Sequence, residues 1–129
     1  MDPIANMFAQ IKNSVAVGHK DCLTPFSKIK ENILAILKEE RYIQDFKVEE
    51  KNGKKNIRIS HAYGEKEKPA FQDLARVSKP GRRIYSPTDK LPYILNGLGM
   101  AIVSTNKGLM TDKRARKEKL GGEIVCKIW

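Results

Sequence analysis

The chain has 129 residues, which suits one compact unit or two small packed subdomains. Hydrophobic residues make up 40% of it, too large a share for a wholly disordered chain, and no apolar run approaches the roughly 18–20 residues that span a bilayer. The formal net charge is +10, with 11 basic and 8 acidic side chains in residues 1–64 and 14 and 7 in residues 65–129, a balance that favours an anionic partner such as nucleic acid.

The first predicted element is a helix. Asp2 can cap it, and Pro3 fits its first position because the missing N–H has no partner there. Gly18 is expected to end it. Lys12 and Asn13 fall outside its apolar face and can meet a partner. That apolar face is predicted to consist of Ile4, Met7, Phe8, Ile11 and Val15.

A short strand at residues 22–24 and a second helix capped by Ser27 are expected next. Lys28 and Lys30 fall in the first turn of this helix, where cations oppose the helix dipole. An external anion is therefore expected to meet them. The buried face of the helix is predicted to be Ile29, Ile33, Leu34, Ile36 and Leu37.

Two strands follow, at about residues 42–49 and 57–63. Asn52-Gly53 between them is typical of a two-residue hairpin turn, because both residues tolerate positive φ. Residues 1–64 thus form a predicted α-β-α-β-β domain. The charged stretch 64–69 is taken as a linker to a strand-rich domain at residues 65–129.

The second domain is predicted to have short helices and more strands, so the fold class is α+β. We expect strands at residues 70–77, 82–85, 100–103 and 123–129. Helices are expected at about residues 91–95, capped by Asp89, and from Thr111, where the helix is basic. A type II turn is expected at Lys79-Pro80-Gly81 and a polar loop at residues 104–108.

Catalytic motifs are not found in the sequence. His19 and His61 have no local nucleophile partner, and there is no phosphate-binding loop and no metal-ligand spacing. We therefore expect no enzyme activity, no cofactor and no metal. Cys22 and Cys126 are interpreted as buried free thiols of a reducing cytosol, and no secretory signal is expected.

Two segments offer anion and base contacts. Lys79, Arg82 and Arg83 surround a tight turn, and Tyr85 follows on the same strand face as Arg83. Arginine–phosphate pairing with aromatic stacking on a base needs such a pattern, although a simple cross-strand pair explains it equally well. The loop Ser104–Gly108 combines hydroxyls, an amide, a cation and a glycine, which suits the shallow minor groove of A-form RNA; on local chemistry alone, an ordinary polar turn is favoured.

Several segments, in one order from the first residues to the last, resemble the family of the eighth protein of the bacterial small ribosomal subunit. They are Asp2-Pro3-Ile4-Ala5, Ser27-Lys28-Ile29-Lys30, Val77-Ser78-Lys79-Pro80-Gly81, Arg83-Ile84-Tyr85, Asn96-Gly97-Leu98-Gly99, Ser104-Thr105, Lys107-Gly108, Met110-Thr111-Asp112, Ala115-Arg116 and Gly121-Gly122-Glu123-Ile124.

The resemblance implies a structural, non-enzymatic constituent of the cytoplasmic 30S subunit. It implies a primary rRNA-binding protein that binds the 16S rRNA central domain and supports platform assembly. The resemblance implies that the fifth and twelfth small-subunit proteins are neighbours. It implies that the free protein is a monomer without membrane contact. Because some family members repress their own translation, the protein's own mRNA is implied as a further partner.

The resemblance also implies which residues contact RNA. The family's main contact loop matches Ser104, Thr105, Asn106, Lys107 and Gly108, with the matches of Tyr85 and Glu123 nearby. The first helix and the start of the second are implied to touch RNA elsewhere, through Lys12, Asn13, Lys28 and Lys30.

Three departures from the family pattern stand out. Asn106 replaces a usual serine, Gln10 and Lys12 stand where arginines are common, and Arg82 replaces an apolar residue. The exchange at position 106 replaces a hydroxyl with a longer amide. The exchanges at positions 10 and 12 replace guanidinium groups, which can bind a phosphate through two hydrogen bonds. A nonspecific nucleic-acid-binding module and, last, an RNA-modifying enzyme are the competing interpretations.

Overall fold

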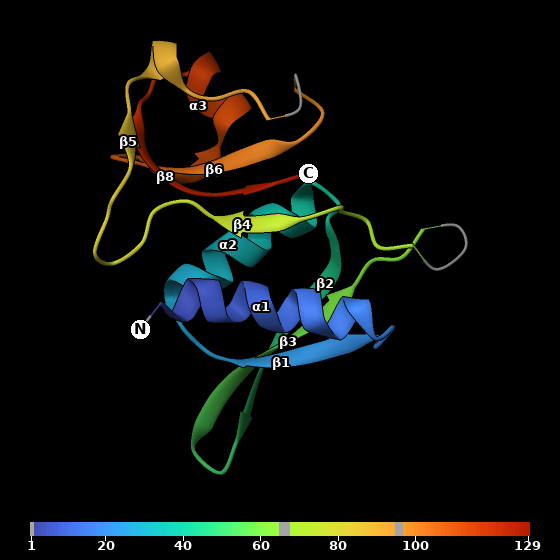
Figure 1. Cartoon of the computed structure of the whole chain (residues 1–129). Coiled ribbons are helices and arrows are strands. Elements are labelled where there is room, and N and C mark those ends of the chain that lie inside the picture. The colour runs from blue at the N-terminus through green and yellow to red at the C-terminus, as the bar shows by residue number, and fades with distance from the viewer. Residues whose placement is uncertain (1, 65–67, 95–96) are drawn as a thin grey trace. The chain divides into compact units, whose positions relative to one another are not determined.

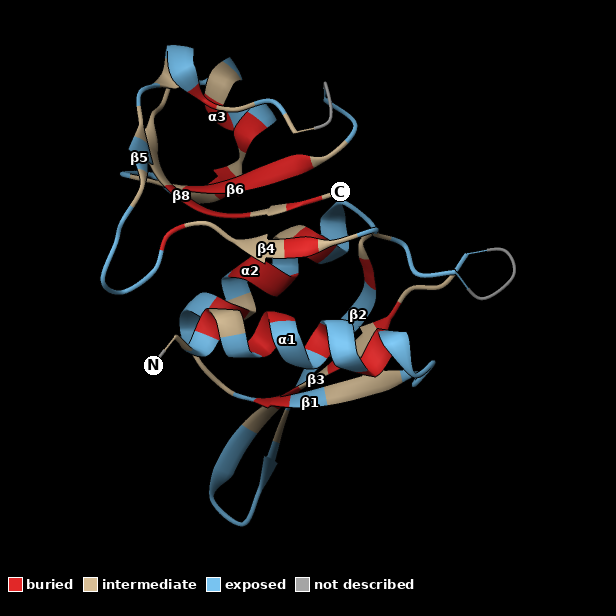
Figure 2. Ribbon diagram, viewed as in Figure 1, coloured by how far each residue is buried: buried red, intermediate tan, exposed pale blue. Residues whose placement is uncertain are grey.

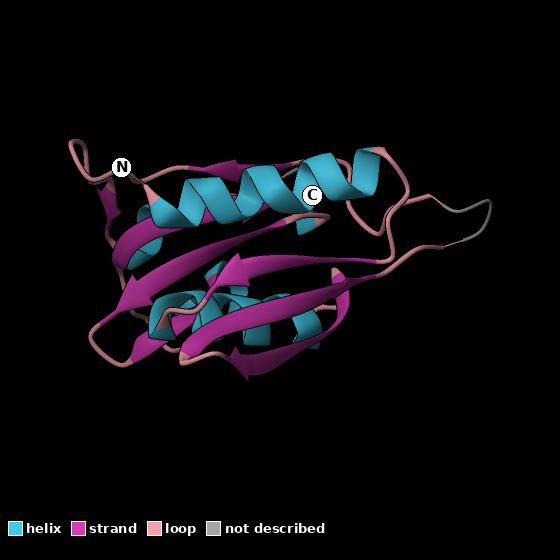
Figure 3. Ribbon diagram, turned by 90° about the horizontal axis from the view of Figure 1, so that it is seen from below, coloured by secondary structure: helices cyan, strands magenta, loops and turns pink. Residues whose placement is uncertain are grey.

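The computed structural model describes residues 2–64, 68–94 and 97–129. They form a mixed α+β fold, as expected, with antiparallel sheets and short helices (Figures 1 and 3). The chain divides into two compact units, one of residues 6–71 and one of residues 72–129 with residues 1–5. The division into domains at residue 64 stays a prediction. Among the described residues, no helix has the length and apolar character needed to cross a membrane.

The unit of residues 6–71 has the predicted element order. Helix α1 (Pro3–Ala16), which enters this unit at residue 6, is followed by strand β1 (Asp21–Pro25), helix α2 (Lys28–Glu39) and strands β2 (Ile43–Lys51) and β3 (Lys54–His61). The sheet order is β1-β3-β2. The predicted caps are confirmed, because Ala5 N donates to the Asp2 carboxylate at 3.2 Å and Lys30 N donates to Ser27 Oγ at 3.3 Å. Buried residues occur in both helices and in the sheet, and Figure 2 colours them red. Among them are Met7, Phe8, Ile11, Ile33, Leu34, Leu37, Ile57 and Ile59.

The buried face of α2 differs from the prediction. Ile29 is 44% exposed, whereas Lys30 is buried. The Lys30 ammonium donates to the Pro25 carbonyl at 3.0 Å and to Thr24 Oγ1 at 3.4 Å, which satisfies the buried charge where the first turn meets the end of β1. Burial lowers the pKa of this ammonium. The expectation of an external anion at Lys30 is therefore wrong, and Lys28 is the exposed cation of the pair.

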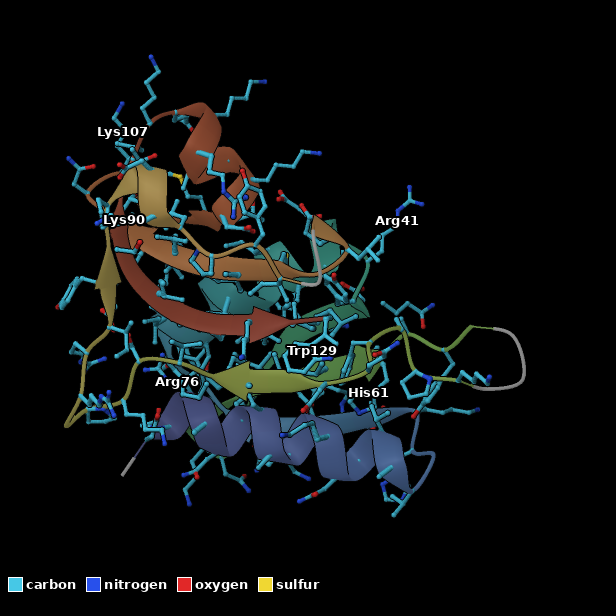
Figure 4. The ribbon with its side chains drawn as sticks, turned by 45° about the horizontal axis from the view of Figure 1, so that its top comes forward. Arg41, His61, Arg76, Lys90, Lys107 and Trp129 are labelled. Carbon is cyan, nitrogen blue, oxygen red and sulfur yellow. The ribbon has the colours of Figure 1, made fainter. Side chains whose placement is uncertain are left out.

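His61 lies at the end of β3 beside the last turn of α1 (Figure 4). Its Nε2 is 2.9 Å from Ser14 Oγ, and that hydroxyl donates to the Asp21 carbonyl. Because a hydroxyl has a single proton, we assign the His61 proton to Nε2. Nδ1 is then buried without a hydrogen-bond partner in the described structure. Burial lowers the pKa of His61, with smaller opposing contributions from Asp21, which raises it, and His19, which lowers it.

This pKa shift predicts a loss of stability in mild acid. Below about pH 6.5 the unfolded imidazole binds a proton that the folded one resists, so the free energy of unfolding falls as the pH falls; above it both states are neutral. In urea titrations between pH 7 and 5, His61→Gln should lose less stability than the parent. The exposed His19→Gln is the control, and equal slopes for parent and His61→Gln would refute the assignment.

The second unit contains strands β4 (Leu74–Arg76), β5 (Tyr85–Ser86), β6 (Met100–Thr105), β7 (Gly108–Thr111) and β8 (Gly122–Ile128), the 3-10 turn η2 (Thr88–Lys90) and helix α3 (Asp112–Lys117). The sheet order is β4-β8-β6-β7, and β5 also pairs with β8. Helix α3 covers one sheet face through a cluster of Leu91, Val103, Met110 and Ala115. The expected strands at 70–77 and 82–85 are shorter than predicted.

Two other expectations for this unit are wrong. The turn at residues 79–82 closes with two backbone hydrogen bonds of 2.9 Å, but Gly81 has no positive φ, so the turn is not type II. No helix forms at residues 91–94, because Pro92 holds Leu91 at ψ 134°, which is extended backbone. The rest of that predicted helix, residues 95–96, lies outside the described residues.

Candidate nucleic-acid interface

The polar loop is a hairpin turn at the end of two strands. Ser104 and Thr105 are the last residues of β6, Gly108 is the first of β7, and Thr105 pairs with Gly108. Asn106 and Lys107 are left as the exposed tip, and Lys107 lies on the outside of its unit (Figure 4). The strong pairing of β6 with β7 and β8 therefore presents a short polar turn on a rigid support.

Thr105 holds the turn together. Its hydroxyl donates to the Gly108 carbonyl at 2.9 Å and accepts from the Lys107 amide at 3.1 Å. One lone pair of the oxygen remains for a partner. Gly108, at φ 106°, adopts a backbone conformation that a side chain would strain. Thr105 thus positions Asn106 and Lys107 more than it offers groups of its own.

Three of the predicted residues form one row across the sheet. Tyr85 on β5 pairs with Glu123 on β8, and Glu123 pairs with Ser104 on β6. Residues directly opposite one another in antiparallel strands project from the same face. The Tyr85–Glu123–Ser104 row therefore lies on the face opposite to the α3 cluster, because Val103, the neighbour of Ser104, belongs to that cluster. Tyr85 is 70% exposed, which leaves its ring free to stack on a partner.

The turn at residues 79–82 is joined to this row by Arg83. Its Nη1 lies 3.1 Å from the Glu123 carboxylate. The carboxylate is largely buried and the guanidinium is more exposed, so a partner at this surface would meet the positive charge of the pair. Ser78 braces the segment: it is fully buried, and its Oγ accepts from Ile84 N at 2.9 Å. The sequence does not predict this brace. Lys79 and Arg82 are exposed on the turn that Ser78 supports.

Close backbone approach at Gly122 determines how the row is assembled. A Cβ built on Gly122 would fall within 3.0 Å of the carbonyl carbon and oxygen of Ser104, and one on Gly121 would meet the Ser86 carbonyl at 2.6 Å. Both contacts are with backbone, which cannot rotate away. The two glycines therefore allow β8 to come close to β5 and β6 at the row.

The basic helix α3 is not part of the Tyr85–Glu123–Ser104 row. Because α3 packs on the sheet face opposite to the row, its cations and the row face different sides of the sheet. Two of its arginines are also engaged within the unit. Arg114 pairs with Glu118 at 2.7 Å, and Arg116 pairs with the buried Asp112 at 2.8 Å and stacks 3.7 Å from the Tyr93 ring.

The remaining predicted residues lie in the other unit. Lys12 and Asn13 are exposed on α1, and Asn13 lines an open groove with Val17 and Leu23, which are themselves exposed. Lys28 forms an exposed ion pair of 2.9 Å with Glu31. Lys30 is inside, as described above. In the described part of the chain, no three His, Cys, Asp or Glu side chains gather as metal ligands.

Comparison with known proteins gives one consistent result. Residues 2–129 match the family described as ribosomal protein S8. Proteins named small ribosomal subunit protein uS8 are similar over nearly their full lengths. The protein from Persephonella marina is 50% identical, and the match covers 99% of this chain and 98% of the relative. The protein from Mycoplasma mobile is 48% identical over 99% of this chain and 96% of the relative. The protein from Caldicellulosiruptor bescii is 46% identical over 100% of this chain and 98% of the relative.

Proposed function

We propose that this chain, which belongs to the ribosomal protein S8 family, binds the central domain of 16S rRNA. The contact would be made by the β6–β7 turn and the Tyr85–Glu123–Ser104 row. The chain is a non-enzymatic structural constituent of the small ribosomal subunit, and rRNA binding is general to the family. Central-domain binding, support of platform assembly and repression of its own mRNA are the finer parts of the proposal.

The proposal is supported by strand pairing, which brings predicted RNA-contact residues of β5, β8 and β6 side by side. Ser104, Glu123 and Tyr85 share one row, Arg83 is tied to it, and Asn106 and Lys107 end the adjoining turn. Short hydroxyl and amide groups can reach 2′-hydroxyls and base edges in the shallow minor groove of RNA, and the exposed tyrosine can stack on a base or sugar. Lys107 supplies a phosphate contact.

The other predicted residues would form secondary contacts with RNA. Lys79, Arg82 and Arg83 would meet phosphates beside the row, and Lys12, Asn13 and Lys28 would form a separate contact on the first unit. Lys30 is not included, because its ammonium is used inside the fold. The fifth and twelfth small-subunit proteins remain proposed neighbours.

Base readout and phosphate contact predict different mutant behaviour. Thr105→Ala and Asn106→Ala should each reduce discrimination between a central-domain RNA hairpin and an unrelated duplex by about 1–3 kcal/mol, the first by loosening the turn and the second by removing an amide. Lys107→Ala should weaken both RNAs alike and reduce the salt slope by about one unit. Filter binding over a salt series measures both effects.

Thr105→Ser is the matched control, because it keeps the hydroxyl that closes the turn. It should discriminate as the parent does. The site is misassigned if the alanine variants at positions 105 and 106 discriminate as well as the parent. A parent that binds the central-domain hairpin no better than the unrelated duplex would overturn the proposed RNA target.

A further inference from the structure

The β2–β3 hairpin extends beyond the third strand of its sheet. The pairing of β1 with β3 ends at Pro25 opposite Asn56, and the Phe26 amide adds one last hydrogen bond of 3.1 Å to the Lys55 carbonyl. Beyond that point the hairpin continues as a two-stranded ribbon (Figure 1). Its last residues, Lys51–Lys55, are all exposed and form what we call the ribbon tip (Figure 2). Asn52 and Gly53 have φ values of 54° and 75°, which close a tight two-residue turn and hold the two strands in register.

Two lysines of the ribbon tip face each other. Lys51 is the last residue of β2 and Lys54 the first of β3, and they are direct partners in the register. Direct partners in antiparallel strands project from the same face with their Cβ atoms about 4.5–5.5 Å apart. Like charges in this arrangement destabilise the hairpin, so the free protein keeps this pair at a cost in stability.

Nearby carboxylates do not neutralise the pair. Glu49 is the diagonal neighbour of Lys54, but its two oxygens accept from Arg58 Nε at 2.7 Å and Nη2 at 3.3 Å. Glu50 pairs with Lys55 and therefore projects from the other face of the ribbon. Among the described residues, no ion pair joins Lys51 or Lys54 to an acid.

We propose that Lys51 and Lys54 of the ribbon tip bind backbone phosphates of rRNA. An anion placed between the two ammonium groups would relieve their repulsion. It would supply the negative charge that Glu49 does not supply, because the Glu49 carboxylate is paired with Arg58. Lysine binds phosphate as a point charge and selects no base sequence. The family places the protein in the small subunit, where RNA supplies the phosphates. This contact lies on a different unit from the β6–β7 turn and goes beyond the proposed function.

Lysine acetylation of the free and RNA-bound protein tests the contact directly. With deproteinised small-subunit rRNA bound, Lys51 and Lys54 should react at least about fivefold more slowly, as measured by mass spectrometry. Lys38 and Lys68, which are exposed on the same unit, are the internal controls and should change little. Unchanged reactivity at both tip lysines would overturn the proposal.

Variants provide the second readout. Lys51→Gln/Lys54→Gln should lower affinity for the rRNA about tenfold and reduce the salt slope by about two units, because each lysine would neutralise one phosphate. Lys38→Gln/Lys68→Gln removes the same charge and should leave the slope near that of the parent. Equal slopes for the two double variants would contradict the proposal.

A charge reversal separates binding from folding. Lys51→Glu turns the like-charge pair into an opposite-charge pair, so the Tm of the free protein should rise by about 1–3 °C while rRNA affinity falls. A purely solubilising role predicts unchanged affinity. Failure of the proposed function would appear in the Thr105 and Asn106 variants and would leave lysine protection at the ribbon tip unaffected.

Discussion

Gly122→Ala is expected to destabilise the protein by about 2–4 kcal/mol and to abolish discrimination between RNAs. The added methyl group would fall within 3.0 Å of the Ser104 carbonyl, closer than real Cβ contacts come. Backbone on both sides must therefore move, which is the costly form of overpacking. Because Ser104 precedes the β6–β7 turn and Glu123 follows Gly122, the shift disturbs the middle of the row.

Gly81→Ala is the matched control for this variant. Gly81 has no positive φ, and a Cβ there meets nothing within 4 Å, so the substitution should change stability by less than about 0.5 kcal/mol. Urea unfolding and filter binding measure the two effects separately. A Gly122→Ala protein as stable as Gly81→Ala would show that β8 and β6 do not approach each other as described.

Asp112→Ala is expected to cost about 3–5 kcal/mol of stability. Asp112 is buried; its Oδ1 accepts from Ala101 N at 3.1 Å, and its Oδ2 pairs with Arg116 at 2.8 Å. Arg116 in turn donates to the Pro92 carbonyl and stacks on Tyr93. Removing the carboxylate leaves a buried amide unpaired and a largely buried guanidinium without its counter-ion.

Asp112→Asn should lose less, because the amide oxygen can still accept from Ala101. The exposed Asp89→Ala provides a baseline for loss of one acid and should be near neutral. Thermal and urea unfolding give the comparison. If Asp112→Ala is no less stable than Asp89→Ala, the carboxylate does not join β6, α3 and the segment 91–93.

Local chemistry in the sequence predicts the first unit well. The cap at Ser27, the Asn52-Gly53 turn and the cap at Asp2, which begins the helix entering this unit, depend on neighbours a few residues away, and all three form as expected. Lys30 is the exception. Its burial depends on a carbonyl of β1 that approaches the helix only in the folded unit, and periodicity alone cannot show a lysine satisfied in that way.

The candidate site was only partly predictable for the same reason. The residues of the β6–β7 turn are contiguous and could be recognised as a polar hairpin. The row is not contiguous: register between β5, β8 and β6 brings Tyr85 and Ser104 to either side of Glu123. The buried brace Ser78 depends on a contact with the Ile84 amide six residues further along the chain, which no short sequence pattern reports. The like-charge pair at the ribbon tip follows from the predicted two-residue turn, because the residues that flank such a turn are direct partners.

Hydroxyl-radical footprinting of this protein on small-subunit rRNA from its own source would locate the RNA segment that the β6–β7 turn contacts. Parent protein and the Asn106→Ala/Lys107→Ala variant would be compared at equal occupancy in low salt. We predict that the parent protects one compact site in the central domain, and that the variant loses protection within that site. Identical protection by both proteins, or protection confined to other domains, would contradict an RNA contact centred on the β6–β7 turn.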